Sequence, residues 1–412
     1  MTAGTTTLRI PAPPRNAPDE PAWLRKLRRA WWNRYEATSW PTGVEEVWRR
    51  TSLRELPRDA APLTGVTTEV SGLDPDAAAR GVVFADLGEA VRTHPDLVQR
   101  HLPAPDGDGQ APASHAAFWA LAHAAWTSGT FLYVPPGVEL DLVLRARSVQ
   151  PRADAAFHPL SVVVADRGAQ VTLLEEFSSP DGAPGWFGGM VDLHVGAEAR
   201  VRYANLQLLG DQVWNLGAQR VEVGADAVVT TLNAEIGSRI TKVGLDVRMA
   251  GKGGTSRLLG ILAAGDDQVI DINSYQDLLA SHTTSDLLYL SALYERAHAS
   301  FYGLTRVRPQ AKQTSSYQEC RNLLLSPTAG AEPIPVLEIE TNDILRCGHG
   351  ATVGAIDPTQ LFYAQTRGLS ADEAERMIVR GFFERTVAEI GSEPIRARVL
   401  GALATRIGQE AA

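Results

Sequence analysis

Hydrophobic and polar residues alternate through the middle of the chain in a pattern that repeats. Gly168-Ala169, Gly196-Ala197 and Gly224-Ala225 recur every 28 residues, and an alternating β-branched segment follows each pair. These segments are Gln170 to Leu174, Arg200 to Leu208 and Val228 to Glu235. In a solenoid, each turn buries its inward Val, Leu and Ile on the neighbouring turns. The pattern predicts a right-handed parallel β-helix, although successive hairpins of a β-sandwich would repeat in a similar way.

Strand-like segments continue to about Arg346, interrupted by glycines at intervals typical of corners. The glycines expected at corners are Gly251, Gly253, Gly254, Gly260, Gly265 and Gly303. We therefore assign residues 129–356 to a β-helix core. The fold class that follows is mainly β with α, because helical patterns lie on both sides of this core.

The chain before the core has the periodicity of helices. Apolar side chains of residues 23–35 fall on one helical stripe, and Arg and Lys fill most of the other positions. The stripe consists of Trp23, Leu24, Leu27, Trp31 and Tyr35. Such a basic amphipathic helix suits a membrane surface, but docking of its Trp face on the protein itself explains the same pattern. We assign residues 21–128 to a helical region and residues 1–20, rich in Thr, Ala and Pro, to a disordered arm.

Helix signals return after the core. Asp357 suits the N-cap of a helix that Gly368 would end. Ser370 begins a capping-box pattern at the start of a second helix, and Pro394 starts a third that extends to Ile407. We assign residues 357–412 to a C-terminal helical region.

Composition places this protein among ordinary globular proteins, with 412 residues and 44% hydrophobic content. A formal charge of −9 and a pI near 5.6 argue against nucleic acid as a partner. The sequence has no run of 18 apolar residues, and its N-terminus lacks the apolar core of a signal peptide. Its two cysteines suit a reducing compartment. We expect a cytoplasmic protein without membrane contact.

Candidate chemistry is concentrated at Cys347 and His349, two residues apart. In an extended strand both side chains would point to one face, where a thiolate beside an imidazole suits iron, zinc or copper(I). Two ligands do not close a metal site, and no C-x-x-C or H-x-x-x-H lies nearby. A buried Cys beside a hydrogen-bonded His would give the same pair. Cys320, the other cysteine, is either a small buried residue or a weaker ligand candidate.

Motifs for catalysis are scarce. Residues 251–254 resemble part of a phosphate-binding loop, but Asp246 stands where its first Gly belongs. Neither G-x-S-x-G nor H-E-x-x-H occurs. Asp266, Asp267 and Asp271 could serve a β-helix polysaccharide-processing enzyme as grouped carboxylates, although adjacent Asp residues after a Gly are also typical of a solvated turn. We expect no catalytic activity.

Several segments together resemble the SufB/SufD family of SUF iron-sulfur cluster assembly proteins, over most of residues 20–390. The main segments are Glu46 to Thr51, Gly129 to Pro135, Ser285 to Tyr289, Gln310 to Thr314, Arg321 to Ser326 and Arg346 to Gly354. The sequence Cys-Gly-His-Gly-Ala-Thr is more similar to that of the D subunits (SufD) than to that of the paralogous B subunits (SufB), which have Glu-His-Glu-Ala at this place.

This resemblance implies a non-catalytic scaffold that pairs with SufB through the β-helix and binds the ATPase SufC through the C-terminal helices. A SufB-like or homodimeric scaffold is the alternative. The side chains expected to contact SufC are Leu361, Phe362, Met377, Ile378 and Phe382. His349 and Cys347, with Cys320 as a weak third, would contribute to an iron or cluster site at the SufB interface. The chain alone would hold no cofactor stably; the complex would carry a transient iron-sulfur cluster or iron, and a role for flavin stays open.

Overall fold

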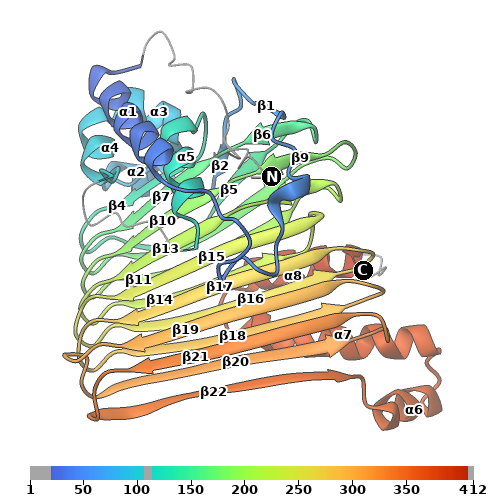
Figure 1. The fold of residues 1–412 in the computed structure, drawn as a ribbon. Coiled ribbons are helices and arrows are strands. Elements are labelled where there is room, and N and C mark those ends of the chain that lie inside the picture. The colour runs from blue at the N-terminus through green and yellow to red at the C-terminus, as the bar shows by residue number, and fades with distance from the viewer. Residues whose placement is uncertain (1–19, 106–113, 407–412) are drawn as a thin grey trace, which may run out of the picture.

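The computed structural model describes residues 20–105 and 114–406. Its centre is a β-solenoid whose chain alternates between two sheets, called sheet A and sheet B here (Figure 1). All strand pairs are parallel apart from β2 with β5 and β3 with β4. The parallel β-helix predicted from the sequence is therefore confirmed. The predicted arm over residues 1–20 lies outside the described residues, Glu20 excepted.

Two long sheets make up the solenoid. Sheet A contains β1 (Ala61–Pro62), β3 (Val83–Asp86), β4 (Thr130–Val134), β6 (Ala155–Phe157), β7 (Leu160–Ala165), β9 (Gly185–Phe187), β10 (Met190–Val195), β12 (Val213–Asn215), β13 (Ala218–Val223), β15 (Ile240–Met249), β17 (Val269–Leu278), β19 (His298–Val307) and β21 (Gly330–Ile339). Sheet B contains β2 (Glu69–Ser71), β5 (Glu139–Val149), β8 (Gln170–Ser178), β11 (Arg200–Leu208), β14 (Val228–Glu235), β16 (Thr255–Ala264), β18 (Thr284–Leu293), β20 (Thr314–Leu324) and β22 (Ile344–Ala355).

The true repeat differs slightly from the one predicted. Gln170 pairs with Arg200, and Arg200 pairs with Val228, so the first interval is 30 residues and the second is 28. Gly168 therefore corresponds to Glu198, not to Gly196. The prediction was two residues out of register because Gly-Ala pairs occur at two different positions of the turn.

One corner of the solenoid repeats with the same backbone geometry. On each of seven successive turns, the residue at this corner has a positive φ. Its backbone N–H donates, at 2.7–3.1 Å, to a backbone carbonyl at the same corner of the next turn, in the residue that precedes the corner residue there. These residues are Gly137, Gly168, Glu198, Asp226, Gly253, His282 and Gln313. We call this series the corner ladder. His282, one member of this series, is exposed at its corner.

Two glycines expected at corners lie inside strands instead. Gly260 is in β16, and a Cβ there would come within 2.2 Å of the Tyr289 ring. Gly303 is in β19, where a Cβ would come within 2.5 Å of the Phe301 ring. Both glycines make room for an aromatic ring, which a sequence pattern does not distinguish from a turn.

The N-terminal helices cover the outer face of sheet A (Figure 1). They are α1 (Ala22–Ala37), α3 (Leu87–Thr93), α4 (Pro95–His101) and α5 (Ala116–Ala125), and a 3₁₀ turn spans Leu53–Glu55. The short helix α2 (Pro75–Ala79) instead packs Ala77 on the interior cluster. Leu24, Trp31 and Tyr35 of α1 are buried in one cluster with Trp186 and Trp214 of sheet A. Docking on the protein itself therefore accounts for the apolar stripe. The short strands β1 to β3 interrupt residues 21–128, which the sequence assigned to helices.

Two C-terminal helices cover sheet B. α7 (Ala371–Ala388) and α8 (Glu393–Arg406) pack on this sheet, whereas α6 (Pro358–Thr366) projects beyond it (Figure 1). The predicted caps are confirmed, because the Asp357 side chain accepts from Thr359 N–H at 2.8 Å, Gly368 has a φ of +99° and Ser370 forms a capping box. Ile407, the predicted last helical residue, lies outside the described part. Within residues 20–105 and 114–406 no helix is long and apolar enough to cross a membrane.

Candidate functional site

The last strand of the solenoid carries the candidate ligands. β22 pairs with β20 in parallel, and this register places Cys347 beside Ser316 and His349 beside Gln318. Ser316 and Gln318 are buried residues of the solenoid interior. Because neighbouring residues of parallel strands point to the same side, Cys347 and His349 share the inward face of β22, as the C-x-H spacing predicted.

The two candidates differ in exposure. The Cys347 side chain is half-buried and packs against the interior cluster, whereas His349 is exposed. No described strand follows β22, so the inward face of this turn is open to solvent at the end of the solenoid (Figure 1). Burial raises the pKa of the Cys347 thiol. The thiol is therefore protonated at neutral pH until a cation stabilises the thiolate.

Cys320 lies one strand further inside. It pairs with Ala351 of β22, two residues beyond His349, and only 3% of its surface is exposed. Burial, with a smaller contribution from the Glu319 charge, raises the pKa of the Cys320 thiol far above its ordinary value. The structure thus places all three sequence candidates on one inner surface, but Cys320 is beneath that surface and Cys347 and His349 are at it.

A hydrogen-bonded floor lies directly under Cys347. Ser316 Oγ donates to Ser285 O at 2.7 Å, and Ser256 Oγ donates to Ser285 Oγ at 2.7 Å. Gln276 Nε2 donates to Ser285 Oγ at 2.7 Å and to its carbonyl at 3.0 Å. These bonds join β16, β17, β18 and β20, so they hold in place the strand on which β22 stacks.

The outer face of β22 is also held in place. The Arg346 guanidinium lies 4.1 Å from the Tyr317 ring centroid, a cation–π distance. A Cβ on Gly350 would come within 3.0 Å of the Tyr317 hydroxyl. Glycine at this position therefore lets β22 lie close to Tyr317.

Cys347 and His349 do not form a complete metal site. Across residues 20–105 and 114–406, no group of three or more His, Cys, Asp or Glu side chains could hold a metal ion. Stable zinc or iron–sulfur sites take about four protein ligands. Within the described residues, Cys347 and His349 therefore supply only part of such a site.

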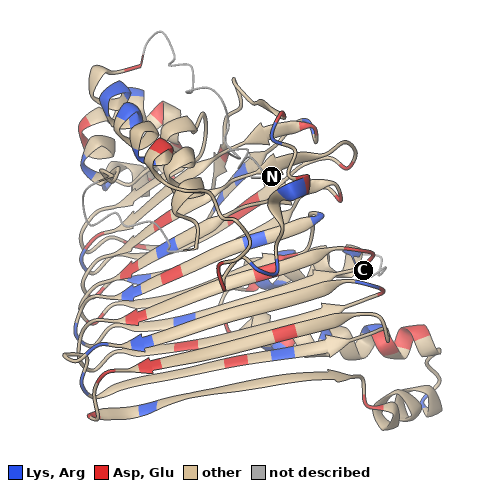
Figure 2. Ribbon diagram, in the orientation of Figure 1, with Lys and Arg blue, Asp and Glu red and all other residues tan. Residues whose placement is uncertain are grey.

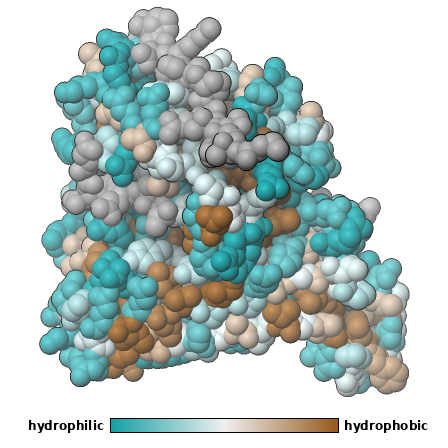
Figure 3. All heavy atoms as spheres, in the orientation of Figure 1, coloured by the Kyte–Doolittle hydropathy of each residue, from teal (hydrophilic) through white to brown (hydrophobic). Residues whose placement is uncertain are grey.

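The residues proposed for partner binding vary in exposure. Phe362 is 67% exposed and Met377 is 51% exposed, and Tyr363 beside Phe362 is 60% exposed. Figure 3 shows hydrophobic atoms on the end where α6 projects from the solenoid. Leu361, Ile378 and Phe382 are half-buried, and Phe382 packs on the cluster between α7 and sheet B. α6 and α7 thus each carry exposed apolar side chains.

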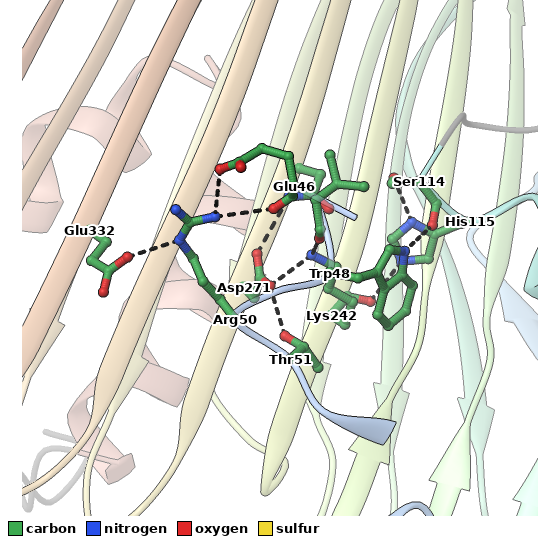
Figure 4. A network of polar contacts seen from close by, with 11 residues as sticks. Glu46, Trp48, Arg50, Thr51, Ser114, His115, Lys242, Asp271 and Glu332 are labelled. Atoms are coloured by element: carbon green, nitrogen blue, oxygen red, sulfur yellow. Dashed lines mark hydrogen bonds and ion pairs between the residues drawn. The ribbon is translucent and has the colours of Figure 1, made fainter. Parts of the chain in front are cut away.

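The three acidic residues considered for polysaccharide chemistry do not share a site. Asp266 occupies an exposed corner with a φ of 51°, and exposed Asp267 pairs with Arg296 at 2.6 Å. Asp271 is buried under residues 41–58, which cross the outer face of sheet A and which we call the strap. It accepts from Thr51 Oγ1 and pairs with Lys242 Nζ, both at 2.7 Å (Figure 4). Asp267 and Asp271 thus have partners of their own, and Asp266 lies apart from Asp271 at the surface.

The buried pair under the strap was missed at the sequence level. Lys242 is fully buried with its Nζ 5.0 Å from the Trp48 ring centroid, and burial lowers its pKa to about 8. The strap also contributes Arg50, whose Nε donates to Glu332 at 2.8 Å (Figure 4). A lysine in an alternating strand is normally expected at the surface, so no sequence pattern predicts this contact. Figure 2 shows further charged residues following one another from strand to strand along sheet A.

Buried acids inside the solenoid were missed as well. Glu175 accepts from Ser161 at 2.6 Å and from Tyr203 at 2.7 Å, and burial raises its pKa. Glu235 accepts from Asn215 Nδ2 at 3.1 Å, and burial raises its pKa to about 7. Glu235 therefore changes charge near neutral pH within the solenoid.

Glu235→Gln should remove part of the pH dependence of stability. Between its ordinary pKa of 4.5 and about 7 the folded state keeps a proton that the unfolded state has lost, so the wild type becomes less stable as pH rises. From about pH 5.5 to about pH 8 this loss is about 2 kcal/mol, and the variant should lack it. Denaturant unfolding at both pH values measures the difference. Glu69→Gln, at an exposed carboxylate, is the control; equal pH slopes for Glu235→Gln and wild type would contradict the expectation.

Comparison with known proteins gives one consistent family. Residues 148–382 match the family model described as "SUF system FeS cluster assembly, SufBD core domain". An iron-sulfur cluster assembly SufBD family protein of Mycobacterium leprae is 28% identical over 372 residues, which cover 88% of this chain and 89% of the relative. Proteins of the same description from Mycobacterium tuberculosis and Staphylococcus epidermidis are 29% and 28% identical, over 88% and 86% of this chain and 88% and 77% of the relatives.

Proposed function

The chain belongs to the SufBD family of SUF iron-sulfur cluster assembly proteins, and from this membership we propose that it is the SufD-type scaffold subunit of a cytoplasmic cluster assembly complex. In this proposal the chain pairs with SufB through the open end of its solenoid and binds the ATPase SufC through α6 and α7. It contributes ligands to a nascent cluster and has no catalytic activity of its own.

The observation that carries the proposal is the half-site on β22. Cys347 and His349 face inward at the end of the solenoid, where no described strand covers them. A paired partner solenoid would cover this end and could supply the missing ligands from its own last strands. The long unpaired edge of β22 favours such a contact, because exposed strand edges are templates for pairing with another chain.

The ligand chemistry fits an iron-sulfur cluster as cargo. Thiolate and imidazole are both known cluster ligands, and the two side chains are separated by one residue on the same face. Because burial raises the pKa of Cys347, the exposed imidazole of His349 is the more available ligand before iron arrives. We therefore assign His349 the main ligand role and Cys347 a supporting one.

Two other arrangements have some support. A homodimer would bring two copies of β22 together and would give two Cys and two His ligands, which is enough for a complete site. A SufB-like role is less favoured than the SufD role, because the sequence around Cys347 resembles that of the D subunits.

Purification of the tagged chain from its native host, with mass spectrometry of the proteins that accompany it, tests the proposal. We expect SufB and SufC in stoichiometric amounts. A chain that purifies alone or only as a homodimer would contradict the SufD role and favour the homodimeric scaffold.

The isolated chain should neither hydrolyse ATP nor retain a cluster. This expectation follows from the missing phosphate-binding loop and from having only two ligands at the open end. ATP turnover and iron content of the purified monomer measure both properties, with the reconstituted complex as the positive control. Stoichiometric turnover or a stable four-iron chromophore in the monomer would overturn it.

A further inference from the structure

A small cavity lined by both apolar and polar side chains lies inside the first half of the solenoid, away from the open end. Its volume is about 20 Å³, and both sheets line it. Sheet B contributes Asn205 and Asn233 from β11 and β14, together with Glu235. Sheet A contributes Asn215 from β12 and Gln219 from β13. Polar side chains are unusual at inward positions that elsewhere carry Val and Leu.

Four polar atoms at this cavity lack a hydrogen-bond partner among the described residues. They are Asn205 Oδ1, Asn233 Oδ1, Gln219 Oε1 and Gln219 Nε2. Gln219 is 2% exposed and Asn233 is 3% exposed, so bulk water does not reach them. Buried polar groups in folded proteins almost always have a partner, because the hydrogen bonds to water that they lose must be replaced.

The neighbouring amides already have other partners. The Asn233 amide already uses its Nδ2 to donate to the Tyr289 hydroxyl at 3.3 Å. The Asn215 amide donates to Glu235 at 3.1 Å. Gln207, which also lines the cavity, is bonded through both amide atoms to Gly237. The unpaired set therefore consists of three acceptor oxygens and one N–H₂ donor.

Water matches this set in both size and chemistry. A cavity of roughly 10–15 Å³ or more by this measure holds one water molecule, and the observed volume is close to that requirement. One water can donate twice and accept twice, so it can bond to two of the oxygens and accept from Gln219 Nε2. A hard cation would suit the oxygens but not the amide donor, and Na⁺ or Ca²⁺ needs more ligands than this cavity offers.

We propose that this cavity is a specific binding site for one ordered water molecule, held by Gln219, Asn205 and Asn233. The water joins sheet A to sheet B across the interior and completes the hydrogen bonding of the buried amides. It also places a polar molecule close to Glu235.

High-resolution crystallography of the full chain tests the proposal directly. One density peak is expected within hydrogen-bonding distance of Gln219 Nε2, with no anomalous signal when the crystals are soaked in Rb⁺. A cavity without a density peak would overturn the proposal. An anomalous Rb⁺ peak would also overturn it and would identify a cation site.

A variant provides an independent reading in solution. Gln219→Leu removes only unpaired polar atoms and is nearly isosteric, so the fold should survive while the peak and one long-lived water in ¹⁷O relaxation dispersion are lost. Gln170→Leu, at a half-exposed position at the start of β8, should leave that count unchanged. An unchanged water count in Gln219→Leu would contradict the proposal, and if this variant does not fold, the wild-type crystal decides alone.

Discussion

His349→Ala should reduce the cluster yield of the complex about 10- to 100-fold while leaving its assembly intact. Loss of one ligand or its supporting partner typically has this effect on metal affinity. Assembly should persist because His349 is exposed and its removal opens no cavity in the solenoid. The measurement is reconstitution with SufB and SufC, followed by counting iron and acid-labile sulfide per complex. The expectation rests on the proposed scaffold role.

Two variants make the comparison specific to His349. His282→Asn changes another exposed histidine, and asparagine tolerates the positive φ of that corner, so its yield should equal wild type. Cys347→Ala should reduce the yield less than His349→Ala, because other thiols and water can replace a half-buried ligand. Wild-type yield in the His349→Ala complex would remove this residue from the site.

Met377→Asp should weaken SufC binding about 100-fold or more. Met377 is half exposed on α7, beside the half-buried Ile378. A carboxylate that becomes buried without a partner in an interface costs several kcal/mol, which exceeds what an average interface residue contributes. Titration of SufC against the variant, by calorimetry or interferometry, measures the change. Phe362→Asp on α6 should act in the same direction.

The control for this experiment is Val44→Asp. Val44 is 80% exposed on the strap over sheet A, whereas α7 covers sheet B, so SufC binding should not change. Phe382→Asp is a poor choice, because Phe382 packs on the α7 cluster and its ring centroid lies 5.3 Å from that of buried Phe383. Full SufC binding by Met377→Asp, with unaltered circular dichroism, would place the docking surface elsewhere.

The solenoid and its helical flanks could be predicted from the sequence because they depend on local rules. Residues that are close in sequence determine the alternation in β8, β11 and β14. The same is true of the helix caps at Asp357 and Ser370. The exact register could not be predicted, since turns of 28 and 30 residues carry similar Gly-Ala pairs. The same limit explains Gly260, whose role depends on Tyr289 one turn later.

The candidate site was predicted in part for the same reason. That Cys347 and His349 share a face follows from their spacing, and the register agrees. Their position at an open end, and the depth of Cys320 beneath it, depend on which strand is last in the stack. The cover of the Lys242–Asp271 pair depends on the strap, whose Thr51 is 220 residues from Asp271 in sequence. No periodicity encodes such contacts.

The corner ladder has a dynamic consequence for β22. The last hydrogen bond of the corner ladder runs from the Gln313 backbone N–H to the Asp343 carbonyl at 2.7 Å. β22 is therefore hydrogen-bonded to the solenoid along one edge only, the edge that faces β20. In a stacked array, each turn opens most readily where it has one neighbour in place of two. Amide hydrogen exchange should therefore be fastest in β22 and slow in β14 and β16. The strand that carries His349 therefore has the lowest free energy of local opening. A partner that covers β22 would slow amide exchange in this strand before it changes exchange elsewhere.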